Sequence, residues 1–80
     1  MKTLKIRLKD GDAVKEFVLE TSKFPETVDV SAEVERRTVD GKSIMGIFSL
    51  NLNVPLLVDI NVDDQEREKA IEESLSKFLV

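Results

Sequence analysis

The sequence predicts an α+β domain in which helices cover one face of a sheet and the other face stays in water. Three segments alternate apolar and polar side chains with the period of two that is typical of a strand with one wet face, and a turn dipeptide predicts one further short strand. Three further segments carry apolar residues at helical spacing, and the order along the chain is β-α-β-β-α-β-α. One-faced strands and helices with one apolar stripe bury each other best in two layers, so we expect a two-layer open-faced sandwich.

The first strand is expected over residues 4–9, where three apolar residues alternate with three basic ones. Asp12 is the expected N-cap of a helix that runs from about residue 13 to residue 23 and is stopped by Pro25. Residues 1–15 hold five basic and two acidic side chains, so we expect a favourable match between the first strand and an acidic strand beside it.

Alternation over residues 28–35 predicts the second strand, and the turn dipeptide Asp40-Gly41 favours a hairpin with a short third strand around Thr38 to Asp40. A fourth strand is expected over residues 56–62. Pro55 opens it at an edge position, where a strand tolerates proline.

Ser43 is the expected N-cap of a two-turn helix over residues 44–50, which Asn51 is expected to end in a left-handed conformation. Asp63, followed three residues later by Glu66, predicts the start of the last helix. Its apolar positions fall at spacings of four and three and are expected to pack on the sheet: Ile71, Leu75 and Phe78.

Composition limits the possible functions. Eighty residues, 41% of them hydrophobic, support one core, so we expect a single domain over residues 1–80. With neither cysteine nor histidine, the chain has no disulfide, no thiolate or imidazole metal ligand, no imidazole base and no phosphohistidine. A net charge of −4 and few aromatic rings disfavour nucleic acid and anionic membranes as partners. No apolar run approaches the roughly 20 residues of a membrane span and no signal-peptide pattern is present, so we expect a cytoplasmic protein.

Two patterns that resemble ligand sites are set aside, and we expect neither a metal nor a cofactor. Gly41-Lys42-Ser43 resembles the end of a phosphate-binding loop, but the glycine required five positions earlier is Arg36. An acidic cluster near the last strand and helix lacks the glycine and the ligand order of a calcium loop: Asp59, Asp63, Asp64 and Glu66.

Ser43 is the best single functional candidate. Its hydroxyl is expected to accept a hydrogen bond from a backbone N–H two or three residues later, which alone explains a serine here. The same position suits phosphoserine, because a phosphate at a helix start meets unpaired N–H groups.

The helix after Ser43 is too apolar to bury every side chain, since one face covers only about half of its residues. By spacing, Ile47 and Leu50 belong to the core, which leaves an exposed apolar patch of Ile44, Met45 and Phe48, or else residues packed under a neighbouring loop. Gly46 is unfavourable inside a helix and predicts a close approach there, either by a partner's backbone or by the loop at Gly11.

The segment Gly41 to Leu50 is similar to the sequence around the regulatory serine of HPr, the histidine-containing phosphocarrier of the bacterial sugar phosphotransferase system. Thr21-Ser22-Lys23-Phe24 also resembles that family, and the order of elements agrees along the whole chain. The resemblance implies an HPr-like fold with a four-stranded antiparallel sheet.

The resemblance also implies a role for Ser43. In HPr relatives the matching serine is the target of a dedicated kinase/phosphorylase, and the phosphorylated form binds a transcriptional regulator of the catabolite control type. Lys42 and Gly46 match their counterparts as well. We therefore expect phosphorylation at Ser43 and partner contacts at Lys42, Ile44, Met45, Gly46 and Phe48.

Where the family holds its phosphorylated histidine, followed by an arginine and a proline, this chain has Asp10, Gly11, Asp12 and Ala13. We expect these residues to be a vestigial phosphocarrier site, because two neighbouring carboxylates repel phosphate where no cation is near. The chain thus looks like the catabolite-repression type of HPr, a binding module rather than an enzyme. Two alternatives stay open: a phosphocarrier that uses Asp10 or Asp12 as acceptor, and a constitutive interaction domain.

Overall fold

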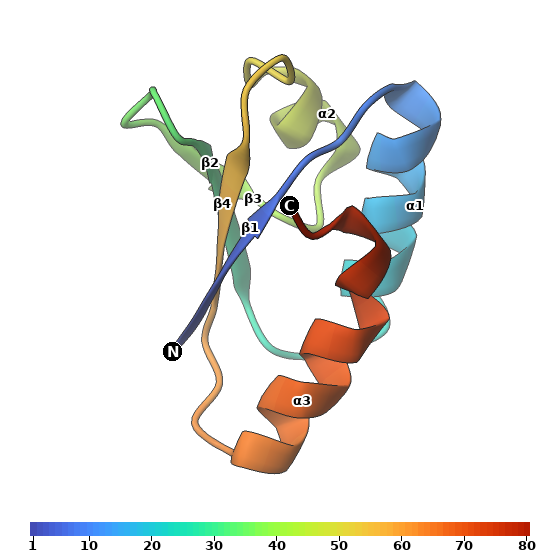
Figure 1. The fold of residues 1–80 in the computed structure, drawn as a ribbon, viewed down its shortest axis with the longest axis vertical. Helices are drawn as coiled ribbons and strands as arrows, with labels where there is room; N and C mark the ends of the chain where they lie inside the picture. The colour runs from blue at the N-terminus through green and yellow to red at the C-terminus, as the bar shows by residue number, and fades with distance from the viewer.

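The computed structural model describes residues 1–80 and has the element order that the sequence predicts. The strands are β1 (Lys2–Ile6), β2 (Val28–Ala32), β3 (Thr38–Asp40) and β4 (Leu56–Ile60); the helices are α1 (Gly11–Thr21), α2 (Ile44–Phe48) and α3 (Gln65–Ser74), followed by the 3₁₀ turn η1 (Ser76–Phe78). The strands form one antiparallel sheet in the order β1-β4-β2-β3. The helices lie on one side of this sheet (Figure 1), so the predicted open-faced α+β fold is confirmed. No helix is both long and apolar enough to cross a membrane.

The core lies between the sheet and the helices. It contains nineteen buried apolar side chains, drawn from every strand except β3 and from all three helices and η1. The rings of Phe17 on α1 and Phe78 on η1 pack edge to face, with centroids 5.5 Å apart. The predicted burial of Ile71, Leu75 and Phe78 is confirmed.

Both acidic N-cap predictions are wrong, by two positions for α1 and by one position for α3. Asp10, not Asp12, caps α1, and its carboxylate accepts a hydrogen bond from the Ala13 N–H at 2.9 Å. Asp64, not Asp63, caps α3 and accepts from the Glu66 N–H. In each case two acidic residues lie close to the helix start, and the one whose backbone is extended at the boundary becomes the cap.

Most element ends also differ from the prediction by a few residues: β1 covers Lys2–Ile6 rather than residues 4–9, α1 covers Gly11–Thr21 rather than residues 13–23, and β4 stops at Ile60 rather than at residue 62. β2 stops at Ala32, because the Glu35 N–H turns back to the Ala32 carbonyl and leaves Val34 70% exposed. Asn51 does not end α2 in a left-handed conformation, since no residue has a positive φ; α2 ends at Phe48 with Ser49 as its cap.

A basic side chain of the first strand finds its acidic partner beyond β4 and not on β4 itself. β1 pairs with β4, where Asp59 accepts a hydrogen bond from the Thr3 hydroxyl at 2.7 Å. Lys5 reaches past β4 to form an ion pair of 3.1 Å with Glu33, just after β2.

Candidate functional site

Ser43 stands at the start of α2 with an extended backbone, as an N-cap requires. Its Oγ accepts a hydrogen bond from the Gly46 N–H at 3.0 Å, so the predicted capping role is confirmed. The Ser43 N–H in turn donates to the carbonyl of Asp40, which joins the start of α2 to the end of β3. Ser43 is half-buried, so part of the residue remains open to solvent, and the Oγ keeps its own proton and a second lone pair.

The side chains of α2 divide between core and surface as their spacing predicts. Ile47 is fully buried, and Leu50 just beyond the helix is 5% exposed. The apolar patch of Ile44, Met45 and Phe48 is open to solvent, with exposed fractions of 40%, 85% and 46%. The helix that Ser43 caps therefore presents three large apolar side chains to solvent.

Gly46 is crowded by its own cap and not by the loop at Gly11. A Cβ on Gly46 would lie 3.2 Å from the Ser43 Oγ and 3.4 Å from the Cβ of Val39 on β3. Gly11 has a different neighbour, because a Cβ there would lie 3.4 Å from the ring of Phe48. The expectation that the Gly11 loop approaches Gly46 is wrong; that loop touches the apolar patch instead.

Lys42, expected to contact a partner, is engaged inside the molecule. Its Nζ donates a hydrogen bond of 2.7 Å to the carbonyl of Phe24 and lies 5.7 Å from the centre of the Phe24 ring. The ammonium group thereby ties the turn before Ser43 to the segment that follows α1.

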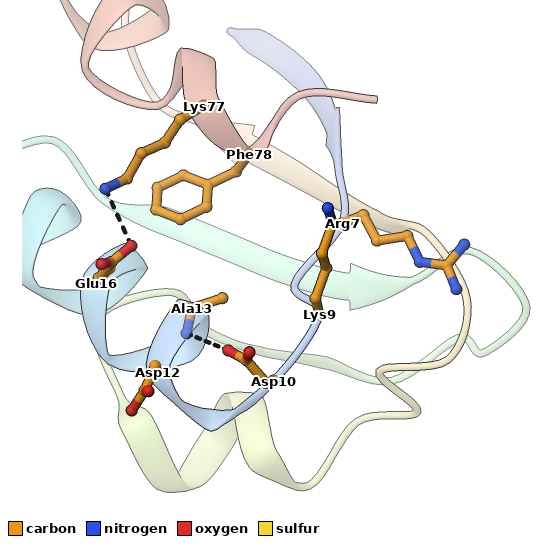
Figure 2. A pocket seen from close by; sticks show the side chains of 8 residues that line it. All are labelled: Arg7, Lys9, Asp10, Asp12, Ala13, Glu16, Lys77 and Phe78. Atoms are coloured by element: carbon orange, nitrogen blue, oxygen red, sulfur yellow. Dashed lines mark hydrogen bonds and ion pairs between the residues drawn. The ribbon is translucent and has the colours of Figure 1, made fainter.

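Three of the four residues expected to be a vestigial phosphocarrier site, Asp10, Asp12 and Ala13, line a pocket of about 330 Å³ at the start of α1, whereas Gly11 does not line it. Figure 2 shows the side chains that line it: Arg7, Lys9, Asp10, Asp12, Ala13, Glu16, Lys77 and Phe78. Three cations and three carboxylates therefore share this pocket.

Some of these charges are already in use. Lys77 forms an ion pair with Glu16 at 3.0 Å, Asp10 caps α1, and the guanidinium of Arg7 donates to the Asn53 carbonyl at 3.1 Å. Asp12 is exposed in the first turn of α1 and makes no ion pair. Because cationic residues line this pocket, the expected repulsion between phosphate and the two aspartates is weaker here.

The groups with shifted pKa values are Glu20, Glu26 and Arg67, and none of them is a predicted site residue. Two hydrogen bonds from Arg67 lower the pKa of Glu26 to about 2, and the same pair raises the pKa of Arg67. Hydrogen bonds from Lys23 and Ser74 lower the pKa of Glu20. No cluster of three or more carboxylates is arranged to hold a metal ion.

Sequence patterns do not indicate the contacts that hold α2 in place. Thr21 is fully buried, and its hydroxyl lies 2.9 Å from the carbonyl oxygen of Gly41. At the other end of α2, the guanidinium of Arg37 donates to the Ser49 carbonyl, and the Glu35 carboxylate accepts from the Asn51 N–H. These partners lie 12 to 20 positions apart, where no periodic pattern indicates them.

One protein family matches nearly the whole chain. The model of one protein family, described as the PTS HPr component phosphorylation site, matches residues 2–79. No curated protein matches the chain at a significant level.

Solved structures of similar fold cover nearly all of the chain. HPr-C-His from Thermoanaerobacter tengcongensis superposes with a TM-score of 0.72 and 28% identity, over 96% of this chain and 92% of that one. A phosphocarrier protein HPr from Bacillus anthracis gives 0.59 and 26%, over 91% and 92%. The histidine-containing phosphocarrier protein of Mycoplasma gives 0.68 over 95% and 93%, and at 15% identity it shows the fold alone.

Proposed function

The chain belongs to the HPr family of the phosphotransferase system, and on that premise we propose that it is a regulatory protein-binding module with a phosphorylation switch at Ser43. The observation that carries the proposal is the position of Ser43, a partly accessible serine at the start of a helix whose three neighbouring apolar side chains are exposed. A hydroxyl and a contact patch thus lie within one short segment.

Phosphorylation changes the chemistry of this surface. The Ser43 Oγ attacks the γ-phosphorus of ATP, a new O–P bond forms, the bond from that phosphorus to the bridging oxygen of ADP breaks, and the hydroxyl proton leaves. The product carries about −1.5 to −2 charges and three strong acceptor oxygens at neutral pH. A purely apolar patch thereby gains a charged rim, which favours a partner that offers an apolar pocket together with a cationic group.

The proposed partners are proteins: a kinase/phosphorylase of the HPr type that modifies Ser43, and a transcriptional regulator of the catabolite control type that binds the modified form. Ile44, Met45 and Phe48 supply the contact surface, with Met45 the most exposed of the three. The chain has no histidine, so it cannot carry a phosphoryl group on an imidazole, and we propose no enzymatic activity for it.

A second candidate function is a phosphocarrier with a carboxylate acceptor. The pocket at the start of α1 favours it, because Arg7, Lys9 and Lys77 line the same pocket as Asp12. Asp12 is the better acceptor of the two aspartates, since the Asp10 carboxylate already accepts the Ala13 N–H. This function predicts an acyl phosphate on Asp12.

The two functions are separated by phosphoryl donor and by product. The protein is incubated with an HPr-type kinase and ATP, and in parallel with phosphoenolpyruvate and the general phosphotransferase enzyme, and each product is mapped by mass spectrometry. We expect a hydroxylamine-stable phosphate on Ser43 from ATP, absent in Ser43→Ala. A product that forms only from phosphoenolpyruvate, is labile to hydroxylamine and is lost in Asp12→Asn would replace our proposal with the second function.

A further inference from the structure

The helix that presents Ser43 is too short to be stable by itself. α2 has five residues, whereas isolated helices shorter than about 12–15 residues are marginal in water. Its position must therefore be fixed by contacts with the rest of the fold. Two of these contacts act on the two residues immediately before Ser43.

The first contact holds Gly41. Thr21 is the only polar residue that is fully buried, and its single hydroxyl proton faces two carbonyl oxygens, Gly41 at 2.9 Å and Val18 at 3.1 Å. The acceptor on Val18 belongs to the same helix and is reached by many helical threonines. The Gly41 carbonyl lies 20 positions away, so this bond joins the last turn of α1 to the turn before Ser43.

The second contact holds Lys42. Its ammonium group donates to the Phe24 carbonyl at 2.7 Å and lies over the Phe24 ring. A charge-assisted hydrogen bond to a partly buried carbonyl is stronger than a neutral one. Both contacts converge on the same place, the segment that ends α1 and follows it.

We propose that Thr21 and Lys42 are positioning residues of the Ser43 site, which clamp the Gly41-Lys42 turn to the end of α1 and so fix the direction of the Ser43 hydroxyl. The clamp is a property of the fold, and its effect on phosphate transfer rests on the proposed function. The two side chains bond to the carbonyls of Gly41 and Phe24 and not to Ser43, so both act through the position of Ser43. For Lys42 this differs from the direct partner contact that the family resemblance implies.

The clamp is tested first without any partner, by hydrogen exchange of the free protein. The Gly46 N–H donates to the Ser43 Oγ and reports on the start of α2, while the Val58 N–H in the central strand β4 reports on the whole fold. In Thr21→Val and Lys42→Met we expect the Gly46 amide to exchange about fivefold faster or more relative to Val58, since each variant removes one hydrogen bond. Thr21→Ser keeps the hydroxyl and should restore the wild-type ratio.

A matched control is Thr3→Val. It also removes a threonine hydroxyl bond, that from Thr3 to Asp59 at 2.7 Å, but on the open face of the sheet away from α2. We expect it to leave the Gly46 to Val58 ratio unchanged. A Gly46 amide that exchanges faster only in step with Val58 in both clamp variants, or that does not change, would overturn the clamp.

Kinetics with an HPr-type kinase and ATP then distinguish a positioning role of Lys42 from a direct contact between Lys42 and the kinase. A misplaced nucleophile lowers kcat while the patch still binds, so we expect kcat to fall about fivefold or more in Lys42→Met, with KM unchanged. A higher KM with unchanged kcat would make Lys42 a direct contact of the kinase and contradict its positioning role. A wild-type protein that is not phosphorylated at all refutes the proposed function, and the exchange measurement alone then decides the clamp.

Discussion

Replacement of Gly41 by alanine is the substitution for which the structure predicts the largest effect from a single added methyl group. Gly41 follows β3 and is buried against β2. A Cβ on Gly41 would lie 2.4 Å from Cγ1 and 2.9 Å from Cβ of Val28, and 3.0 Å from Cγ2 of Val30. Because no glycine has a positive φ, the penalty is steric and not conformational.

The size of the effect follows from the lack of free space. Val28 and Val30 are 2% and 0% exposed, so neither side chain can turn toward solvent. An added methyl group in a packed core typically costs about 1–3 kcal/mol of unfolding free energy. With contacts as short as these, we expect Gly41→Ala to cost about 2 kcal/mol or more. For a domain of this size, each 1 kcal/mol shifts Tm by about 4–8 °C, so Gly41→Ala should lower Tm by about 8–16 °C.

Thermal unfolding followed by circular dichroism measures this shift, with Gly11→Ala as the matched control. A Cβ on Gly11 would make an ordinary contact of 3.4 Å with the Phe48 ring, so this variant should stay within about 0.5 kcal/mol of the wild type. A Gly41→Ala protein whose Tm lies within about 2 °C of the wild type would refute the packing described here.

Three further predictions concern the cap, an ion pair and the patch. Ser43→Ala should cost about 1 kcal/mol of unfolding free energy, whereas Ser43→Asp should retain most of the stability because aspartate also caps; urea unfolding at neutral pH compares them, and equal losses would contradict the capping role. Arg67 lowers the pKa of Glu26 from 4.5 to about 2, so the charged Glu26 stabilises the fold above about pH 4.5, and this contribution is lost as the pH falls to about 2. The stability difference between wild type and Glu26→Gln should shrink over that range, and a constant difference would show that the pair adds nothing. Met45→Ser should leave Tm nearly unchanged, because Met45 is 85% exposed, and should abolish binding of the regulator by phosphorylated protein.

Much of the fold could be predicted because its signals are local and periodic. The alternating strands, the apolar stripe of α3 and the Ser43 cap each depend on residues a few positions apart, and the structure confirms all three. The division of α2 into a buried Ile47 and an exposed Met45 follows from the same helical period.

The exact starts of helices were harder to predict, because neighbouring residues offer the same chemistry. Asp10 and Asp12 are both good N-caps, and only the course of the backbone decides between them. Gly11 takes the first helical position and lies against the ring of Phe48 from α2. That contact joins segments far apart in the chain, so the sequence alone does not reveal it.

The role of Lys42 cannot be predicted from the sequence, for a similar reason. The family resemblance implies a partner contact for Lys42, and nothing in the sequence indicates that Phe24, 18 positions away, accepts its hydrogen bond. Arg37 and Ser49 are a second example, since a hairpin loop donates to the end of α2. Such side-chain to backbone contacts depend on how the finished layers fit together.

In the proposed function, phosphate on Ser43 switches a binding surface. Isothermal titration of a catabolite-control regulator with phosphorylated and unmodified protein measures this switch, with Ser43→Ala carried through the same kinase treatment as the control. We expect the phosphorylated form to bind at least tenfold more tightly, a difference of about 1.4 kcal/mol. Equal affinities for the two forms would contradict the switch and favour a constitutive interaction domain.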